Sequence, residues 1–434
     1  MQSVGEHFGA ATLLSDEPRK TTVTALTDLT LLALSKANFL SLIGSVEHIV
    51  RREGQRRQWY SANSLREVSL RDFEVGRTLG CGAYGRVRLV YHRQKRRAYV
   101  LKSMKKTDVV LLRQEAHVSA ERTILASVDH AFIVRLAASF QDEMRIFMLM
   151  EPLMGGELTL HMALHKGRKL GEPSARFYAG CITCALAYLH SLKIAYRDLK
   201  PENIVLDAEG YAKLVDFGFA KTIEERAWTL CGTPEFMAPE VVAHQGHGTP
   251  VDWWGLGVLV HEMVTGVTPF VPPYAETDTG QDFLMKVYAL ATRSSGVELS
   301  FPRFVGDEAR DLISRLLAVS PAQRIGAKSF TPNHGAADVK AHPFFQMPGN
   351  SLHFEKLEAR ELRPPFVPKG LPKYDDIDGI PPPTETQRRE EAMIVGVNID
   401  KVAEEVLSPE DNILFRGEYI RADELLAGKV FPDF

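Results

Sequence analysis

Hydrophobic and polar positions follow different periods in successive parts of this 434-residue chain. Short apolar segments at 73–79 and 87–91 flank a glycine-rich stretch, which predicts two strands joined by a turn. Residues 115–125 have apolar side chains at helical spacing, and 173–190 is a longer helix-like run rich in Ala, Leu and Tyr. After residue 345 the chain becomes rich in proline and charge, which favours an extended tail. The pattern therefore predicts an α+β domain followed by a tail.

Composition narrows the class of protein. A hydrophobic content of 45% is ordinary for a globular chain, and a formal net charge of −3 leaves no electrostatic footprint for nucleic acid. No apolar run reaches the roughly 18 residues of a membrane span, and the first residues lack a secretion-signal pattern. We therefore expect a cytoplasmic protein with no membrane span and no nucleic-acid partner. Cys181 and Cys184 form a CxxC inside the predicted helix at 173–190, and we expect them to be core residues rather than a metal or redox pair.

The residues with the clearest chemical meaning lie at 196–203, with the sequence Tyr-Arg-Asp-Leu-Lys-Pro-Glu-Asn, and at 216–218, with the sequence Asp-Phe-Gly. Phosphoryl transfer requires positioned reactants and neutralised charge. The first run offers a carboxylate that can accept a hydroxyl proton and a lysine that can face a phosphate, and the two runs together offer oxygen ligands that suit Mg²⁺. Alone, each residue would also fit a turn or a helix cap; the ordered set is far more specific. The candidates are Asp198, Lys200, Asn203 and Asp216.

The glycine-rich stretch at 80–87 reads Gly-Cys-Gly-Ala-Tyr-Gly-Arg-Val. Glycines permit a close approach of the backbone to a ligand, so this turn can cover the phosphates of a nucleotide. A dinucleotide-binding turn of similar sequence opens into a helix, whereas this one opens into the predicted strand at 87–91. The context argues against a glycine-rich oxidoreductase.

These motifs together resemble the eukaryotic protein kinases. The resemblance implies a bilobal α+β fold, with a small β-rich lobe and a large helical lobe, and ATP and Mg²⁺ as cofactors. It implies that Asp198 orients the acceptor hydroxyl, that Asn203 and Asp216 hold Mg²⁺, and that Lys102 contacts ATP and pairs with Glu121. The hinge between the lobes would lie at 150–153. The implied ATP-binding residues are Leu79, Gly80, Cys81, Gly82, Ala83, Tyr84, Gly85, Arg86, Val87, Val100, Lys102, Met150, Glu151, Leu153 and Glu157.

Residues 228–235, Trp-Thr-Leu-Cys-Gly-Thr-Pro-Glu, resemble the activation segment of AGC-group kinases. The resemblance implies phosphorylation of Thr229, by an activating kinase or by autophosphorylation. A phosphate there needs cationic partners, which the family pattern places at His117, Arg197 and Lys221.

Three acidic residues match positions that bind arginines preceding the target residue in this family. Carboxylates hold arginine by bidentate, charge-assisted hydrogen bonds. The resemblance therefore implies protein substrates with basic motifs, and Lys200 fits a Ser/Thr kinase rather than a tyrosine kinase. The substrate-recognition candidates are Glu157, Glu202 and Glu262.

The two ends carry weaker resemblances. Residues 346–434, with Pro-Pro-Phe-Val-Pro at 364–368 and a terminal Phe-Pro-Asp-Phe, resemble the AGC-kinase tail, whose final aromatic residues fill a groove on the small lobe. Residues 1–45 resemble part of a cyclic-nucleotide-binding domain, a partial β-roll in which Arg19 would hold the cyclic phosphate. Ala10 stands where that family has the Glu that binds the ribose. Residues 46–72 are predicted to form a linker helix, and 73–345 the catalytic domain.

The whole chain most resembles a cGMP-dependent protein kinase with a truncated sensor domain, and we expect it to be a monomer. Three alternatives remain open. The chain could be a cAMP-dependent-like or constitutively active AGC kinase whose incomplete cyclic-nucleotide site is only structural. It could be a nucleotide-binding module without catalysis, although its cassette is incomplete. It could be a pseudokinase scaffold, although the lysine, both aspartates and the asparagine expected for catalysis are all present.

Overall fold

The computed structural model divides the chain into two units, residues 1–64 and 65–434. The structure describes residues 24, 65, 68–82, 85–223, 226–272, 280–292, 299–327, 335–346, 351–368, 413–415, 418–420 and 431. The predicted cyclic-nucleotide segment with Arg19, nearly all of the predicted linker helix and most of the predicted tail lie outside the described residues.

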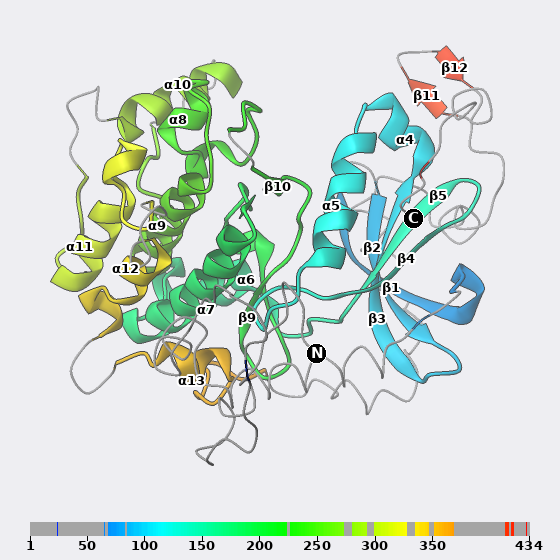
Figure 1. The fold of residues 1–434 in the computed structure, drawn as a ribbon, viewed down its shortest axis with the longest axis horizontal. Helices are drawn as coiled ribbons and strands as arrows, with labels where there is room; N and C mark the ends of the chain where they lie inside the picture. Colours follow the sequence, from blue (N-terminus) through cyan, green and yellow to red (C-terminus); the bar gives the residue numbers. More distant parts are fainter. Residues whose placement is uncertain are drawn as a thin grey trace. The chain divides into compact units, whose positions relative to one another are not determined.

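A five-stranded sheet with the order β1-β2-β3-β5-β4 forms the small lobe, and all its neighbouring strands are antiparallel (Figure 1). One face carries a helix whose buried residues include Val118, Ile124 and Leu125. The predicted strands at 73–79 and 87–91 and the predicted helix at 115–125 are confirmed. The elements are β1 (Phe73–Gly82), β2 (Gly85–His92), β3 (Arg97–Lys105), α4 (Lys106–Leu111), α5 (Glu115–Ser127), β4 (Leu136–Gln141) and β5 (Arg145–Met150).

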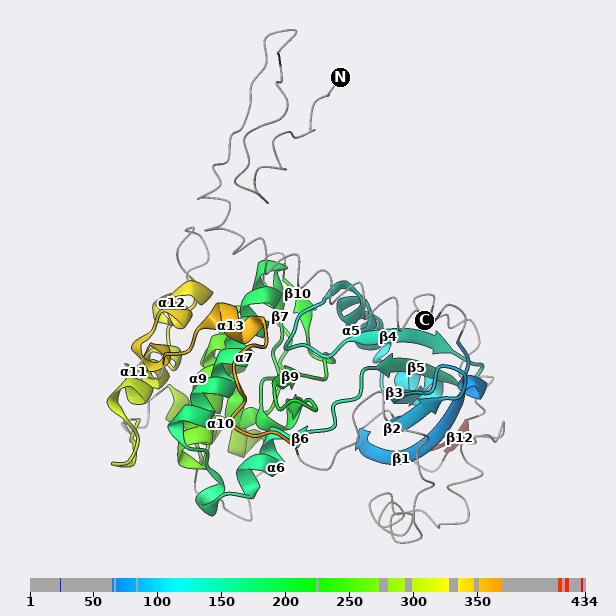
Figure 2. The ribbon, with the colours of Figure 1, turned by 90° about the horizontal axis from the view of Figure 1, so that it is seen from below.

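Helices dominate the large lobe, which Figure 2 shows in green to yellow. Its main helices are α6 (Leu158–Ala163), α7 (Glu172–Ser191), α8 (Pro239–Val242), α9 (Pro250–Thr265), α10 (Gly280–Ala291), α11 (Asp307–Leu316) and α12 (Ala336–Lys340). Short strands line the side facing the small lobe: β6 (Gly156–Glu157), β7 (Ile194–Ala195), β8 (Ile204–Leu206), β9 (Ala212–Leu214) and β10 (Lys221–Thr222). They form a three-stranded sheet, β6-β8-β9, and a pair, β10-β7.

The centre of the large lobe is α9. Proline at its first position and a left-handed Gly266 (φ 88°) at its C-terminal cap define its ends. Nearly every residue of this helix is buried, including Trp253 and Trp254, so the helix packs against its neighbours on all sides. The predicted helix at 173–190 is confirmed as α7, which packs against α9. Cys181 and Cys184 are buried within α7, as expected for core residues.

Described parts of the tail lie against both lobes. Helix α13 (Phe354–Glu358) packs on α7, and Arg360 then binds Asp207 and Glu209 in the β8–β9 turn. Phe431 is 4% exposed on the small lobe, where its carbonyl accepts a hydrogen bond of 2.8 Å from Gln141. A short hairpin precedes it, formed by β11 (Ile413–Phe415) and β12 (Glu418–Ile420). Among the described residues, no helix is long and apolar enough to cross a membrane.

Candidate active site

The glycine turn closes the hairpin of β1 and β2, with Gly82 opposite Gly85. A Cβ on Gly85 would lie 1.8 Å from the backbone oxygen of Ser103, so only glycine fits there. A Cβ on Gly80 would meet nothing within 4 Å, which leaves room beside this part of the strand. Ala83, Tyr84 and the side chain of Cys81 lie outside the described residues.

Lys102 on β3 connects the two lobes. Its Nζ atom lies 2.6 Å from Oε1 of Glu121 on α5 and 3.6 Å from Oδ1 of Asp216 in the large lobe. Burial acts to lower the pKa of Lys102, but the carboxylates of Glu121 and Asp216 outweigh it, so that the pKa is raised. The lysine is therefore a fixed cation in the cleft, in the pairing predicted from the sequence.

Asp198 is 5% exposed and lies among donors. The amide of Asn203 donates to the Asp198 carboxylate (2.7 Å) and backbone carbonyl (2.9 Å), and Nζ of Lys200 lies 2.9 Å from the same carboxylate. Thr233, which sequence reasoning did not identify, donates from its hydroxyl to the other carboxylate oxygen (3.3 Å) and accepts from Lys200 (3.0 Å). This contact joins residues 196–203, which we call the catalytic loop, to the predicted activation segment.

Asp252 of α9 anchors the catalytic loop from the core. Its carboxylate accepts from the backbone N–H groups of Tyr196 (2.9 Å) and Arg197 (2.8 Å) and lies 2.7 Å from Nε2 of His190. The backbone of Arg197 is left-handed (φ 67°), a conformation that such fixed contacts can hold. The loop is thus pre-organised before any ligand binds.

The residues present fit a magnesium ion. Because the amide nitrogen of Asn203 is committed to Asp198, its side-chain oxygen is the atom left to face a cation. Although burial opposes it, Lys102 lowers the pKa of Asp216 and keeps this carboxylate ionised. One carboxylate and one amide oxygen, completed by phosphate oxygens and water, are a typical magnesium donor set.

The hinge follows β5. Val100 on β3 is in register with Met150, so these two predicted ATP-binding residues are neighbours. The side chain of Glu151 accepts from Lys213 of β9 (2.6 Å) and from the backbone N–H of Arg135 (2.9 Å). Lys213 is 2% exposed, and its ion pair with Glu151 was not anticipated from the sequence. The hinge is therefore tied to the strand that leads to Asp216.

Of the three predicted substrate-recognition carboxylates, Glu202 acts electrostatically on the other two. Burial and then the neighbouring Glu202 raise the pKa of Glu157. Burial, Glu202 and Glu235 raise the pKa of Glu262 to about 7, against the opposing charge of Arg168. Oε2 of Glu262 is buried without a hydrogen-bond partner in the described part of the chain. An unsatisfied, buried carboxylate oxygen in an acidic cluster is a natural acceptor for a cationic side chain.

In the activation segment, Thr229 is exposed. Among its predicted cationic partners, Arg197 is half-buried, Lys221 on β10 pairs with Ala195 two residues before Arg197, and His117 is exposed on α5 beside Gln114 (2.6 Å). The structure places Lys221 and Arg197 on neighbouring segments of the large lobe, whereas His117 belongs to the small lobe.

The fold and this cleft define a protein kinase. Residues 73–345 match the model of the protein kinase domain, and residues 2–45 match that of the cyclic nucleotide-binding domain. The chain belongs to the protein kinase family, which confirms the predicted bilobal α+β fold.

Its relatives place it in the cyclic-nucleotide-dependent AGC branch. It is 43% identical over 301 residues to the human cAMP-dependent protein kinase catalytic subunit PRKX, covering 69% of this chain and 78% of that protein. It is 43% identical to cAMP-dependent protein kinase type 3 of Saccharomyces cerevisiae, covering 70% of each chain. It is also 36% identical over 422 residues to human cGMP-dependent protein kinase 2, covering 87% of this chain and 53% of that protein.

Proposed function

We propose that the chain transfers the γ-phosphoryl group of ATP to Ser and Thr hydroxyls of proteins, with basic residues before the target. The observation that carries this proposal is the arrangement across the cleft. Lys102 bridges Glu121 and Asp216 on one side, and Asp198 is held by Asn203 and Lys200 on the other. These contacts bring together the side-chain charges that phosphoryl transfer uses alongside a metal ion.

The side chains have distinct roles in this proposal. Asp198 orients the acceptor hydroxyl and accepts its proton, and Lys200 faces the transferred phosphoryl group. Lys102, held by Glu121, positions the ATP phosphates. Asn203 and Asp216 would hold Mg²⁺, which neutralises the charge of the phosphates when bound. The glycine turn at 80–85 and the hinge at 150–153 bind the nucleotide.

Substrate choice follows from the acidic cluster. Burial and then the negative charge of Glu202 raise the pKa of both Glu157 and Glu262, so this cluster favours cations, and a substrate arginine would relieve the repulsion from Glu202. Arginines before the target hydroxyl are therefore favoured over neutral residues.

Regulation by cGMP is the finer part of the proposal. The match to human cGMP-dependent protein kinase 2 covers 87% of the chain, whereas the match to the cAMP-dependent catalytic subunit covers 69%. This wider coverage and the match of residues 2–45 to the cyclic nucleotide-binding domain support a kinase of the cGMP-dependent type. Arg19 would hold the cyclic phosphate. A second candidate, a kinase indifferent to cyclic nucleotides, is favoured by Ala10, which cannot hydrogen-bond a ribose hydroxyl.

The test is a peptide-kinase assay on the whole chain with phosphate on Thr229 confirmed by mass spectrometry. A serine peptide with arginines two and three residues before the target is compared with an alanine-substituted peptide and a tyrosine peptide. We expect turnover of the basic serine peptide that requires Mg-ATP and is lost in Asp198→Asn. No turnover would overturn the kinase assignment, and turnover unaffected by cGMP and cAMP would leave the cyclic-nucleotide-independent candidate.

A further inference from the structure

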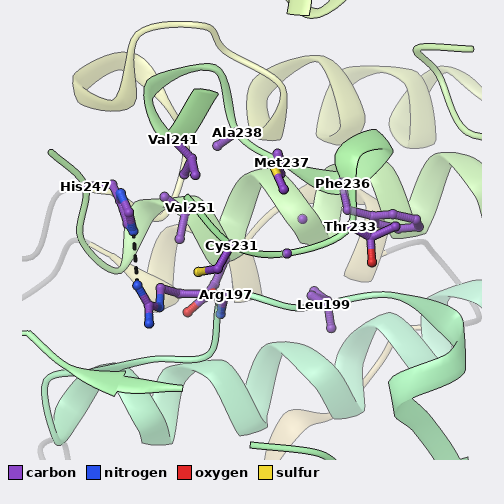
Figure 3. A pocket seen from close by; sticks show the side chains of 13 residues that line it. Arg197, Leu199, Cys231, Thr233, Phe236, Met237, Ala238, Val241, His247 and Val251 are labelled. Carbon is purple, nitrogen blue, oxygen red and sulfur yellow. Dashed lines mark hydrogen bonds between the residues drawn. The ribbon is translucent and has the colours of Figure 1, made fainter. Parts of the chain in front are cut away.

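Arg197 lies in a small cavity between the catalytic loop, the activation segment and the beginning of α9 (Figure 3). Cys231 and His247 are among the residues that line it. The Arg197 guanidinium donates from Nε to the carbonyl of Phe219 (2.8 Å), and its Nη1 lies 3.4 Å from Nε2 of His247. Among the described residues, no hydrogen bond involves Nη2 of Arg197. One edge of the guanidinium is fixed, and the other is available.

The contact with His247 requires a neutral imidazole. A guanidinium has only donors, so Nε2 of His247 accepts and its proton lies on Nδ1. Burial lowers the pKa of His247, and the charges of Arg197 and Lys221 act in the same direction, whereas Glu240 and Asp252 act against it. Near neutral pH the ring is therefore uncharged and suited to hold the arginine.

The main chain of His247 also holds the activation segment. Ala227 and His247 exchange two backbone hydrogen bonds of 2.8 Å. Gly246 is left-handed (φ 71°), and a Cβ there would lie 3.0 Å from the Trp228 ring, so the indole packs against this glycine. These contacts fix the two residues immediately before Thr229.

The residues two positions before and two positions after Thr229 both lie in the surroundings of Arg197. On one side, Ala227 is bound to His247, whose ring contacts Arg197. On the other side, Cys231 lines the cavity that contains Arg197, as Figure 3 shows. Because residues 227 and 231, on either side of Thr229, both lie in the surroundings of Arg197, the free guanidinium edge is a candidate partner for a phosphate on Thr229.

We propose that His247 is a positioning residue for phosphothreonine at 229. Its main chain sets the register of the activation segment, and its ring orients the Arg197 guanidinium so that Nη2 faces the phosphate. A pre-oriented arginine loses less conformational entropy when it binds phosphate. This inference rests on the proposed phosphorylation of Thr229, but it concerns the binding of that phosphate and not the transfer reaction.

The decisive measurement is the pKa of the phosphothreonine, followed by ³¹P NMR of the whole chain. The second pKa of free phosphothreonine is about 6, and contact with arginine lowers it. We expect the lowered pKa to rise in His247→Leu toward the value of Arg197→Ala. His247→Gln, whose amide oxygen reaches the position of Nε2, is the matched control and should retain it. The ratio of phosphorylated to unphosphorylated activity should fall about tenfold in His247→Leu, or ~1.4 kcal/mol of coupling, and less than threefold in His247→Gln.

Two comparisons separate this inference from its alternatives. In an Arg197→Ala background, His247→Leu should change the phosphate pKa no further; a second, additive shift would overturn the claim that His247 acts through Arg197. Equal phosphate pKa values in the wild-type and His247→Leu chains would also overturn it. If His247→Leu does not fold, His247→Asn, whose shorter amide falls short of Arg197, takes its place with the same expectations. A normal pKa shift without peptide turnover would refute the kinase proposal and support this one.

Discussion

Two ion pairs of similar chemistry occupy different environments in this molecule. Lys102 and Glu121 meet at 2.6 Å in the cleft, where the lysine also lies 3.6 Å from Asp216. Arg324 and Glu240 meet through two parallel hydrogen bonds of 2.8 and 3.0 Å in the large lobe, and Arg324 also donates to the carbonyls of Ala318 and Pro250. The first pair has a competing partner, and the second has its donors committed to fixed acceptors.

The difference separates a charge that acts from a charge that supports. The side chain of Lys102 remains 21% exposed, so a nucleotide phosphate can replace part of its carboxylate contact. The side chain of Arg324 is 0% exposed and stacks 5.2 Å from the Trp254 ring, with no room for a ligand. Replacing both partners of a buried, fully satisfied ion pair costs little stability, whereas replacing only one leaves a buried charge without a partner and costs much more.

The largest expected effect is on catalysis at the Lys102–Glu121 pair, which we call the open pair because Lys102 is partly exposed. Replacing Lys102 by Met removes the cation that faces Glu121 and Asp216, and we expect kcat/KM for the basic peptide to fall about 10³-fold, as for other electrostatic contacts made in the transition state. Glu121 would remain buried without its lysine, but burial already raises its pKa, so it can take up a proton. Circular dichroism should therefore show a smaller fall in melting temperature than for Arg324→Met. Lys102→Arg is the control for charge without the same geometry. A variant with nearly full activity would show that the open pair has no catalytic role.

Arg324 and Glu240, which we call the closed pair, should affect stability more than catalysis. Arg324→Met leaves Glu240 buried without a partner, and we expect a loss of about 3–5 kcal/mol of stability. Thermal unfolding would measure this as a large drop in melting temperature. The double variant Arg324→Met/Glu240→Gln removes both charges and should recover part of the loss. A melting temperature unchanged in the single variant would contradict the distinction between the two pairs.

The sequence predicted the open pair better than its surroundings. Lys102, Glu121, Asp198 and Asn203 belong to motifs whose order and local spacing are visible in the chain, and the strand and helix that carry them follow from hydrophobic periodicity. Thr233 reaches Asp198, 35 residues away, and His247 reaches Arg197, 50 residues away. Such contacts depend on how the activation segment and the beginning of α9 pack together. Threonine and histidine are too common in loops to reveal these roles from sequence.

A smaller effect is expected where the acidic cluster meets a substrate. Because the pKa of Glu262 is raised to about 7, the carboxylate is mostly protonated at about pH 6 and mostly ionised at about pH 8. Only the ionised form binds arginine strongly, so KM for the basic peptide should fall several-fold as pH rises across this range. Glu262→Gln should have a higher KM, by about tenfold at pH 8, and a flat profile. Steady-state kinetics with the alanine-substituted peptide serve as the control, because its KM should not follow the Glu262 titration.

Glu151 and Lys213 form a third ion pair. This pair tests whether burial alone sets the stability cost of breaking an ion pair in this protein. Their atoms meet at 2.6 Å, and Lys213 is 2% exposed, yet Glu151 also accepts from the backbone of Arg135. Burial lowers the pKa of Lys213, while Glu151 opposes that shift. Without the carboxylate, the pKa of Lys213 should fall further, and the lysine can lose its proton instead of remaining a buried charge.

We therefore expect Glu151→Gln to cost only about 1–2 kcal/mol of stability at neutral pH, because the remaining lysine can lose its proton. This loss is smaller than the one expected for Arg324→Met.

The sign of the pH dependence follows from linkage. A lysine with a lowered pKa in the folded state binds fewer protons there than in the unfolded state, so stability rises with pH up to the ordinary pKa of lysine. Urea unfolding at about pH 7 and about pH 9.5 should show a steeper rise for Glu151→Gln than for the wild-type chain. The double variant Lys213→Met/Glu151→Gln has no charge to titrate at this site and should show no such rise of stability with pH. An equally large loss at both pH values would place this pair with Arg324 and Glu240, and burial alone would then set the cost of breaking an ion pair in this protein.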